Sequence, residues 1–93
     1  MSNVDEMITL VLKEPTQDGG DFSGFDLKGV SLNGASFVFA TMVETVIDDS
    51  ELREIDFSQA SLGKTSFKNA KIKDLNFTGA DLEETSFEGA TLV

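Results

Sequence analysis

The chain has 93 residues, 17 of them acidic and 7 basic, which gives a net charge of −10, and it contains no Cys, His, Trp or Tyr. A chain of this length suits one small domain. Without Cys or His, it has no disulfide, thiolate zinc site or imidazole base, so we expect no enzymatic activity, no metal site and no cofactor. The negative charge argues against direct binding to nucleic acid or to an anionic membrane.

The first predicted element is a cap helix over residues 3–13. Its apolar residues recur at helical spacing: Val4, Met7, Ile8 and Val11. Asn3 can serve as the N-cap, and Pro15 follows the expected end of the helix. Residues 8–12 also have strand character, so a strand stays open as an alternative. Residues 14–20 are expected to form the connecting loop.

The N-terminal segment shows no sign of targeting. It is acidic rather than basic, and its apolar run is short, which argues against a signal peptide. No stretch approaches the roughly 18–20 apolar residues that a membrane span needs. We therefore expect a cytoplasmic protein that does not contact membranes. Residues 1–19 are predicted to form the cap and loop, and residues 20–93 the main domain.

The main domain repeats every five residues. From Phe22 onward each fifth residue is large and apolar, in fifteen positions out of fifteen. The series is Phe22, Leu27, Leu32, Phe37, Met42, Ile47, Leu52, Phe57, Leu62, Phe67, Ile72, Phe77, Leu82, Phe87 and Leu92. A small residue usually stands two places before the large one, a short polar residue one place before it, and Gly often two places after it.

A period of five fits neither an α-helix nor a flat strand. All large side chains share one interior only if the chain turns once per unit, and four such turns close one coil. Short polar side chains and Gly suit turns at the corners. Stacking of residues that lie four units apart predicts two interior ladders. One contains Phe37, Phe57 and Phe77, and the other contains Leu27, Ile47, Phe67 and Phe87.

This unit resembles the A(D/N)LXX repeat of the pentapeptide-repeat family, which Ala80-Asp81-Leu82-Glu83-Glu84 matches directly. The resemblance covers about 70 of the 93 residues. It implies an all-β fold, a right-handed quadrilateral parallel β-helix, here with between three and four coils and a short helical N-terminal cap. It also implies a structural or protein-interaction role with an unknown protein partner.

The C-terminal end of the repeats is expected to be open. The end lies around Leu82, Phe87, Leu92 and Val93, and the last coil is incomplete. An open β-solenoid end needs a cover. We expect a homodimer that pairs two such ends, as in gyrase-binding members of the family, although those use an additional module. The alternative is that the chain is a fragment of a larger protein.

Acidic residues concentrate on two adjoining sides of the predicted coil. The candidate partner face consists of Asp21, Glu44, Asp48, Asp49, Asp81, Glu83 and Glu84. Some family members resemble B-form DNA in their acidity. The alternative function is therefore an acidic DNA mimic that binds and modulates DNA gyrase or topoisomerase IV. Against it stand the short rod and the absence of the loop insertion found in quinolone-protection members.

Four apolar residues fall at outward positions on the first two coils. They are Val38, Phe39, Val43 and Val46. A contiguous apolar group on a surface indicates a covering partner. We expect the N-terminal helix to cover this group, and otherwise it is a candidate site for an external partner.

Overall fold

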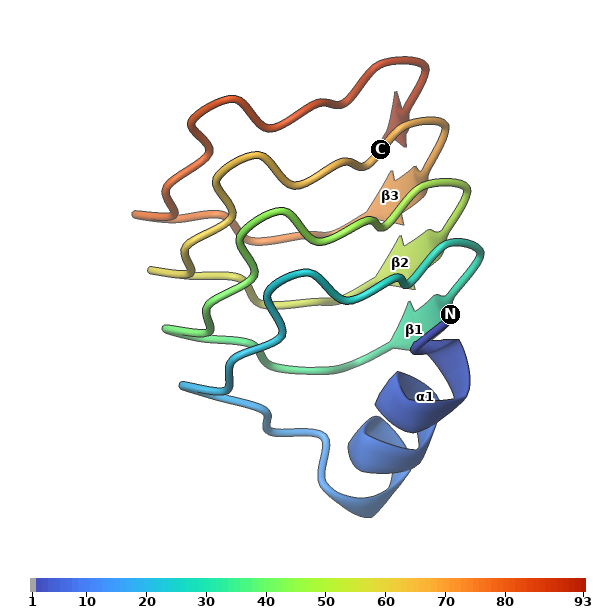
Figure 1. Ribbon diagram of the computed structural model, residues 1–93, viewed down its shortest axis with the longest axis vertical. Helices are drawn as coiled ribbons and strands as arrows, with labels where there is room; N and C mark the ends of the chain where they lie inside the picture. The colour runs from blue at the N-terminus through green and yellow to red at the C-terminus, as the bar shows by residue number, and fades with distance from the viewer. Residues whose placement is uncertain (1) are drawn as a thin grey trace.

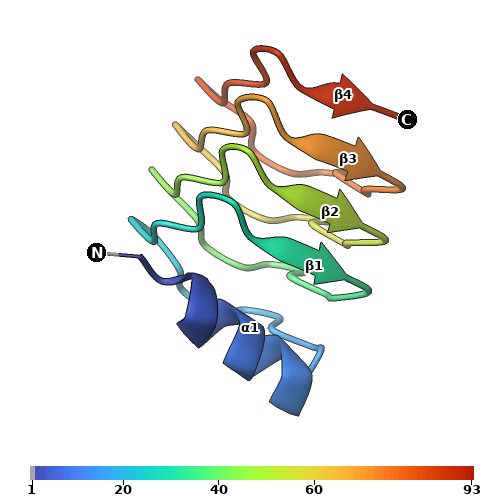
Figure 2. The ribbon, with the colours of Figure 1, turned by 90° about the vertical axis from the view of Figure 1, so that its right-hand side faces the viewer.

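The protein is a stack of coils with one helix at its N-terminal end. The structure is a computed structural model that describes residues 2–93; Met1, the first residue of the predicted cap, lies outside them. The elements are α1 (Val4–Lys13), β1 (Ser31–Asn33), β2 (Glu51–Arg53), β3 (Lys71–Lys73) and β4 (Thr91–Leu92). The four strands pair in parallel in the order β1-β2-β3-β4, and α1 lies beyond the first coil (Figures 1 and 2).

Each coil takes four repeat units, because every pairing joins residues that lie four units apart along the chain. On the side that carries the strands, Leu32 pairs with Leu52 and Leu52 with Ile72. Isolated parallel bridges with the same offset occur on the other three sides. The first side begins at residue 16, the second at 21, the third at 26 and the fourth at 31, and each side recurs once in every coil. The predicted right-handed quadrilateral β-helix is confirmed.

The stack begins earlier than the sequence pattern indicates. Thr16 pairs with Ser36, and the N–H of Gln17 donates to the Ser36 carbonyl at 2.7 Å. Residues 16–20 therefore form the first side of the first coil, so the prediction of a loop over 14–20 is wrong for them. The pattern did not show this because Gln17 stands where the repeat has a large apolar residue.

The corners explain the five-residue unit. Every fifth residue from 19 to 89 has a positive φ, and nine of these fifteen residues are not Gly. The Phe37 carbonyl accepts from the Ala40 N–H at 3.0 Å, as in a type II turn. The polar residue before the large one supports the turn, since Asp56 Oδ1 accepts from the Ser58 N–H at 2.8 Å. Local polar bonds thus offset the strain of the left-handed corner residues.

The core runs along the axis of the stack. Eleven of the fifteen large residues are buried; the exceptions are Phe77, Leu82, Phe87 and Leu92, all on the last coil. Rings in successive coils stack, with centroids 5.5 Å apart for Phe57 and Phe77 and 5.0 Å apart for Phe67 and Phe87. Such stacks bury large apolar areas and add favourable ring contacts.

One interior corner is polar and is satisfied by the backbone. Thr45 Oγ1 donates to the Phe22 carbonyl at 2.9 Å, and Thr65 and Thr85 donate in the same way to the coil before them. Ser50, at the next corner along the chain, is 1% exposed, and its hydroxyl has no hydrogen-bond partner among residues 2–93. The Thr ladder links successive coils, whereas Ser50 carries an uncompensated polar atom.

Helix α1 closes the N-terminal end of the core. Met7 is fully buried, and its apolar neighbours on the helix pack against the core cluster. Asn3 stands at the N-cap, but its side-chain oxygen accepts from the Asp26 N–H at 2.8 Å rather than from the helix. The predicted N-cap position of Asn3 is therefore confirmed, but its side-chain oxygen joins the helix to the first coil. At the other end, Gln17 Nε2 donates to the Glu14 carbonyl at 2.6 Å.

Candidate interaction surfaces

The second side is the most acidic surface of the solenoid. It carries Asp21, Glu44, Lys64, Asp81, Glu83 and Glu84, for a net charge of −4. Gly63 lies between Val43 and Glu83 in the stack and leaves a hollow of about 220 Å³ there. The hollow is lined by Val43, Gly63, Lys64, Asp81, Glu83 and Glu84. The rim has three carboxylates and the ammonium group of Lys64, for a net charge of −2, so the hollow can receive a cationic side chain.

Some of these carboxylates support the fold and others are free. Asp21 Oδ1 accepts from the Ser23 N–H at 3.0 Å, and Asp81 Oδ1 accepts from the Glu83 N–H at 3.0 Å. Hydrogen bonds from the backbone and then the side chain of Ser23 lower the pKa of Asp21, against a smaller opposing effect of desolvation. By contrast, the side chains of Glu44, Glu83 and Glu84 form no hydrogen bond or ion pair within residues 2–93.

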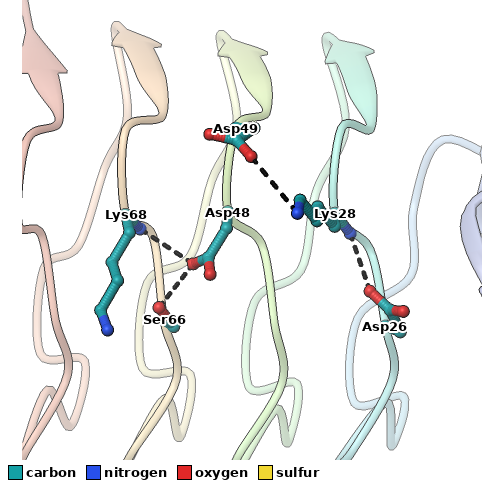
Figure 3. A network of polar contacts seen from close by, with 6 residues as sticks. All are labelled: Asp26, Lys28, Asp48, Asp49, Ser66 and Lys68. Atoms are coloured by element: carbon teal, nitrogen blue, oxygen red, sulfur yellow. Dashed lines mark hydrogen bonds and ion pairs between the residues drawn. The ribbon is translucent and has the colours of Figure 1, made fainter.

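The two remaining residues of the candidate acidic face lie on the third side (Figure 3). Asp48 Oδ1 accepts from the Ser66 hydroxyl and from the Lys68 N–H, the latter at 3.0 Å, so it links two coils. Asp49 is a corner residue with a φ of 58° and pairs with Lys28 at 3.9 Å. An exposed pair of this kind contributes little to stability. The carboxylate of Asp48 therefore stabilises the stack of coils.

The predicted apolar group lies entirely on the second coil and is not covered by α1. Val38, Val43 and Val46 are half-buried within their own coils, whereas Phe39 is 66% exposed. Helix α1 closes the end of the axis instead of a side (Figure 2), so the expected cover is wrong. Burial of Met7 against the core favours this position of the helix. Phe39 has a φ of 60° at the corner between the first and second sides.

The C-terminal end of the stack exposes interior residues. Leu82 is 36% exposed, Leu92 is 62% exposed and Val93 is 82% exposed, while Phe87 is half-buried. In the earlier coils the N–H of each large residue donates to the following coil, as Phe57 does to the Asn76 carbonyl at 2.8 Å. The equivalent N–H groups of Leu82 and Phe87 have no such partner within residues 2–93. The end is both apolar and an unpaired edge.

Gly63 is a sequence signal for the hollow, although the five-residue pattern does not single it out. Gly63 is the only Gly directly after a large residue of the repeat, where no positive φ is required. The missing side chain of Gly63 therefore leaves room for the hollow and is not needed for the backbone conformation.

Among residues 2–93, no three carboxylates lie close enough together to hold a metal ion. No helix in this part of the chain is long and apolar enough to cross a membrane.

Comparisons with known proteins agree with the geometry. Residues 50–90 match the family described as pentapeptide repeats, in eight copies. A search of curated proteins found no match.

Among solved structures, the chain is similar to QnrB1, a plasmid-mediated fluoroquinolone resistance protein, with 26% identity and a TM-score of 0.75 over 84% of this chain. The chain spans only 41% of the length of QnrB1.

Two cyanobacterial proteins share the fold. HetL of Nostoc sp. strain PCC 7120 is a pentapeptide-repeat protein involved in regulation of heterocyst differentiation. It has 19% identity and a TM-score of 0.55, and the similarity covers 83% of this chain and 46% of HetL. Rfr23 of Cyanothece 51142 has 16% identity and a TM-score of 0.52, and the similarity covers 96% of this chain and 95% of Rfr23. The repeat match over residues 50–90, the register of four units per coil and these structures show that the chain carries pentapeptide repeats and has the fold of the solved pentapeptide-repeat proteins.

Proposed function

We propose that the chain is a non-catalytic interaction module of the cytoplasm that binds a basic protein surface through its second side. The observation that carries this proposal is the hollow at Gly63, which is rimmed by the free carboxylates of Glu83 and Glu84. A Lys or Arg side chain fits this site, with its aliphatic stem against Val43 and its charge at the rim.

Phe39 extends the same surface. It is exposed at the corner next to the second side, in a conformation that is unfavourable for a bulky residue. Aromatic residues are enriched at the centres of protein interfaces because they bury a large area at small entropic cost. We expect Phe39 to supply the apolar contact beside the acidic hollow.

Binding of a synthetic Lys- and Arg-rich peptide, followed by fluorescence anisotropy, tests this proposal. The variant Glu44→Gln/Glu83→Gln/Glu84→Gln should lose binding. The matched variant Glu51→Gln/Glu54→Gln/Asp74→Asn removes the same charge from the fourth side and should bind as the wild type does. Equal losses in the two variants would show that only net charge matters and would refute a specific site.

We further propose that two copies pair through their C-terminal ends. The exposed Leu82 and Leu92 and the unpaired N–H groups support this, because an isologous contact covers both ends at once. Sedimentation of wild type and of Leu82→Glu/Leu92→Glu tests it, with Leu12→Glu as the control at the other end. A species of 10.0 kDa at every concentration would rule out the dimer.

The second candidate function is an acidic DNA mimic that modulates DNA gyrase or topoisomerase IV. The likeness to QnrB1, a fluoroquinolone resistance protein, and the net charge of −10 favour it. Supercoiling by purified gyrase and decatenation by topoisomerase IV should then change on addition of the protein, and the second-side variant should lose the effect. If micromolar protein leaves both reactions unchanged, mimicry is excluded.

A further inference from the structure

The fourth side carries a groove to which Arg53, Lys71 and Lys73 contribute three cationic side chains. Strands β2 and β3 direct Leu52 and Ile72 inward, so the residues that alternate with them stand on the outer face, which is turned toward the viewer in Figure 2. The groove has a volume of about 310 Å³. Around it lie Glu51, Arg53, Lys71, Lys73, Thr91 and Val93.

The three cationic side chains of this groove form no ion pair within residues 2–93. Arg53 and Lys73 are direct register partners on β2 and β3, and like charges placed opposite each other destabilise a sheet. Lys71 is opposite Glu51, yet neither forms an ion pair; the one ion pair found within residues 2–93 joins Lys28 to Asp49. The lining side chains, three cations and one carboxylate, carry a net charge of +2 in a chain whose net charge is −10.

Outward charges alternate in sign along the third side, unlike those on the fourth side. On the third side the outward residues after the large ones are Lys28, Asp48, Lys68 and Glu88. The equivalent positions on the fourth side are Asn33, Arg53, Lys73 and Val93. The fold therefore accommodates charge alternation, whereas the fourth side places two cations next to each other, which is unfavourable unless an anion binds there.

We propose that this groove binds a small phosphorylated molecule through a diphosphate group. The Arg53 guanidinium can donate a bidentate pair of hydrogen bonds to phosphate oxygens, and the ammonium groups of Lys71 and Lys73 supply further charge. The excess positive charge of the lining side chains favours a multiply charged anion such as a diphosphate, and the volume lies at the lower end of that of small-molecule sites.

A compact ligand fits better than an extended acidic peptide. The corner next to the groove carries Glu54 and Asp74, and the third side carries Asp48 and Asp49. Carboxylates thus border the cationic surface, and an anionic chain that extends beyond the groove would meet like charge. The ligand is therefore expected to place its anionic part within the groove alone.

Titration of ¹⁵N-labelled protein with pyrophosphate tests the site. We expect saturable shifts at the backbone amides of Lys71, Lys73 and Thr91. In Arg53→Gln/Lys73→Gln the apparent affinity should fall by about tenfold or more, which corresponds to about 1.4 kcal/mol, because charge-assisted hydrogen bonds to the phosphate oxygens are lost. Lys68→Gln, which changes the equivalent position on the third side, should leave the affinity unchanged.

Three results would overturn the proposal. They are shifts that rise linearly without saturation, an equal loss in Lys68→Gln and in the double variant, and tighter binding of triglutamate than of pyrophosphate. The last result would assign the groove to an acidic peptide.

Thermal melting supplies a readout that does not depend on a ligand. At low salt Lys73→Gln should melt at a higher temperature than the wild type, because it removes the repulsion from Arg53, and the gain should vanish at 1 M salt, where the screening length is about 3 Å. A lower melting temperature for Lys73→Gln at low salt would show that the cations are not repulsive and would remove the argument for a ligand.

Discussion

The two ends of the solenoid use the same repeat and differ in what covers them. At the N-terminal end α1 lies over the first coil, where Met7 is fully buried and Phe22 is 6% exposed. At the C-terminal end Leu82 is 36% exposed and Leu92 is 62% exposed, although both occupy the same position of the repeat as Phe22. Figure 1 shows the contrast between the helix-covered coil and the bare last coil.

The comparison shows that a repeat position does not by itself define a buried residue. In a solenoid each coil contacts only its neighbours, so stability is close to a sum of layers and of the interfaces between them. A large side chain in an inner coil is covered from both directions, and one in the last coil from only one. Substitutions of equivalent residues should therefore have effects that depend on their layer.

The largest expected effect is at Phe57. It is 2% exposed and stacks with Phe37 and Phe77 on either side, so Phe57→Ala should lower the free energy of unfolding by about 3–5 kcal/mol through the cavity it leaves. Phe87→Ala, in the half-buried last coil, should cost roughly half as much because less apolar area is lost. Urea unfolding measures both, and equal costs would mean that the last coil is covered in solution.

The next effect concerns the helix that closes the other end. Met7→Ala should lower the free energy of unfolding by about 2–3 kcal/mol, because Met7 is fully buried against the core. Leu12 is on the same helix and 80% exposed, so Leu12→Ala should change stability by less than about 0.5 kcal/mol. If Met7→Ala leaves urea unfolding unchanged, α1 does not close the stack.

Smaller changes in stability are expected for the buried hydroxyl groups, and for the Thr ladder they should depend on the coil. Thr65→Val removes a buried hydrogen bond to the Met42 carbonyl and should cost about 1 kcal/mol, whereas Thr85→Val, in the part-buried last coil, should cost less. Ser50→Ala should instead stabilise the protein by up to about 1 kcal/mol, since it removes a buried hydroxyl that has no partner. Chemical denaturation of the three variants measures this, and a loss of stability in Ser50→Ala would contradict the assignment.

The smallest effect is a pH dependence in the first coil. The hydrogen bonds with Ser23 hold the pKa of Asp21 below its ordinary value of 3.8 in the folded state. The stabilisation of the folded state by the Asp21 carboxylate is therefore complete above pH 3.8 and is lost as the pH falls through the lower, folded-state pKa. In acid titrations of stability, the difference between wild type and Asp21→Asn should shrink at low pH. A constant difference would show that the carboxylate charge does not support this corner.

The five-residue period by itself determined much of this protein. Large residues at a spacing of five share one interior only if the backbone turns after every unit, and the short polar residues before them supply the bonds of those turns, as Asp56 does. Period, coil length and interior ladders all follow from local geometry, because the same corner recurs at a fixed interval. The helical cap could also be anticipated from its apolar spacing.

Only the tertiary structure decided where that helix lies, where the stack begins and which outward residues meet. Asn3 bonds the first coil instead of its own helix, and Gln17 takes a repeat position that its polarity concealed. The alignment of Arg53 with Lys73 and the hollow at Gly63 depend on side chains in successive coils, which are distant along the chain. The five-residue pattern does not reveal such neighbours, because the burial and the charge environment of a surface residue depend on the side chains of the adjacent coils.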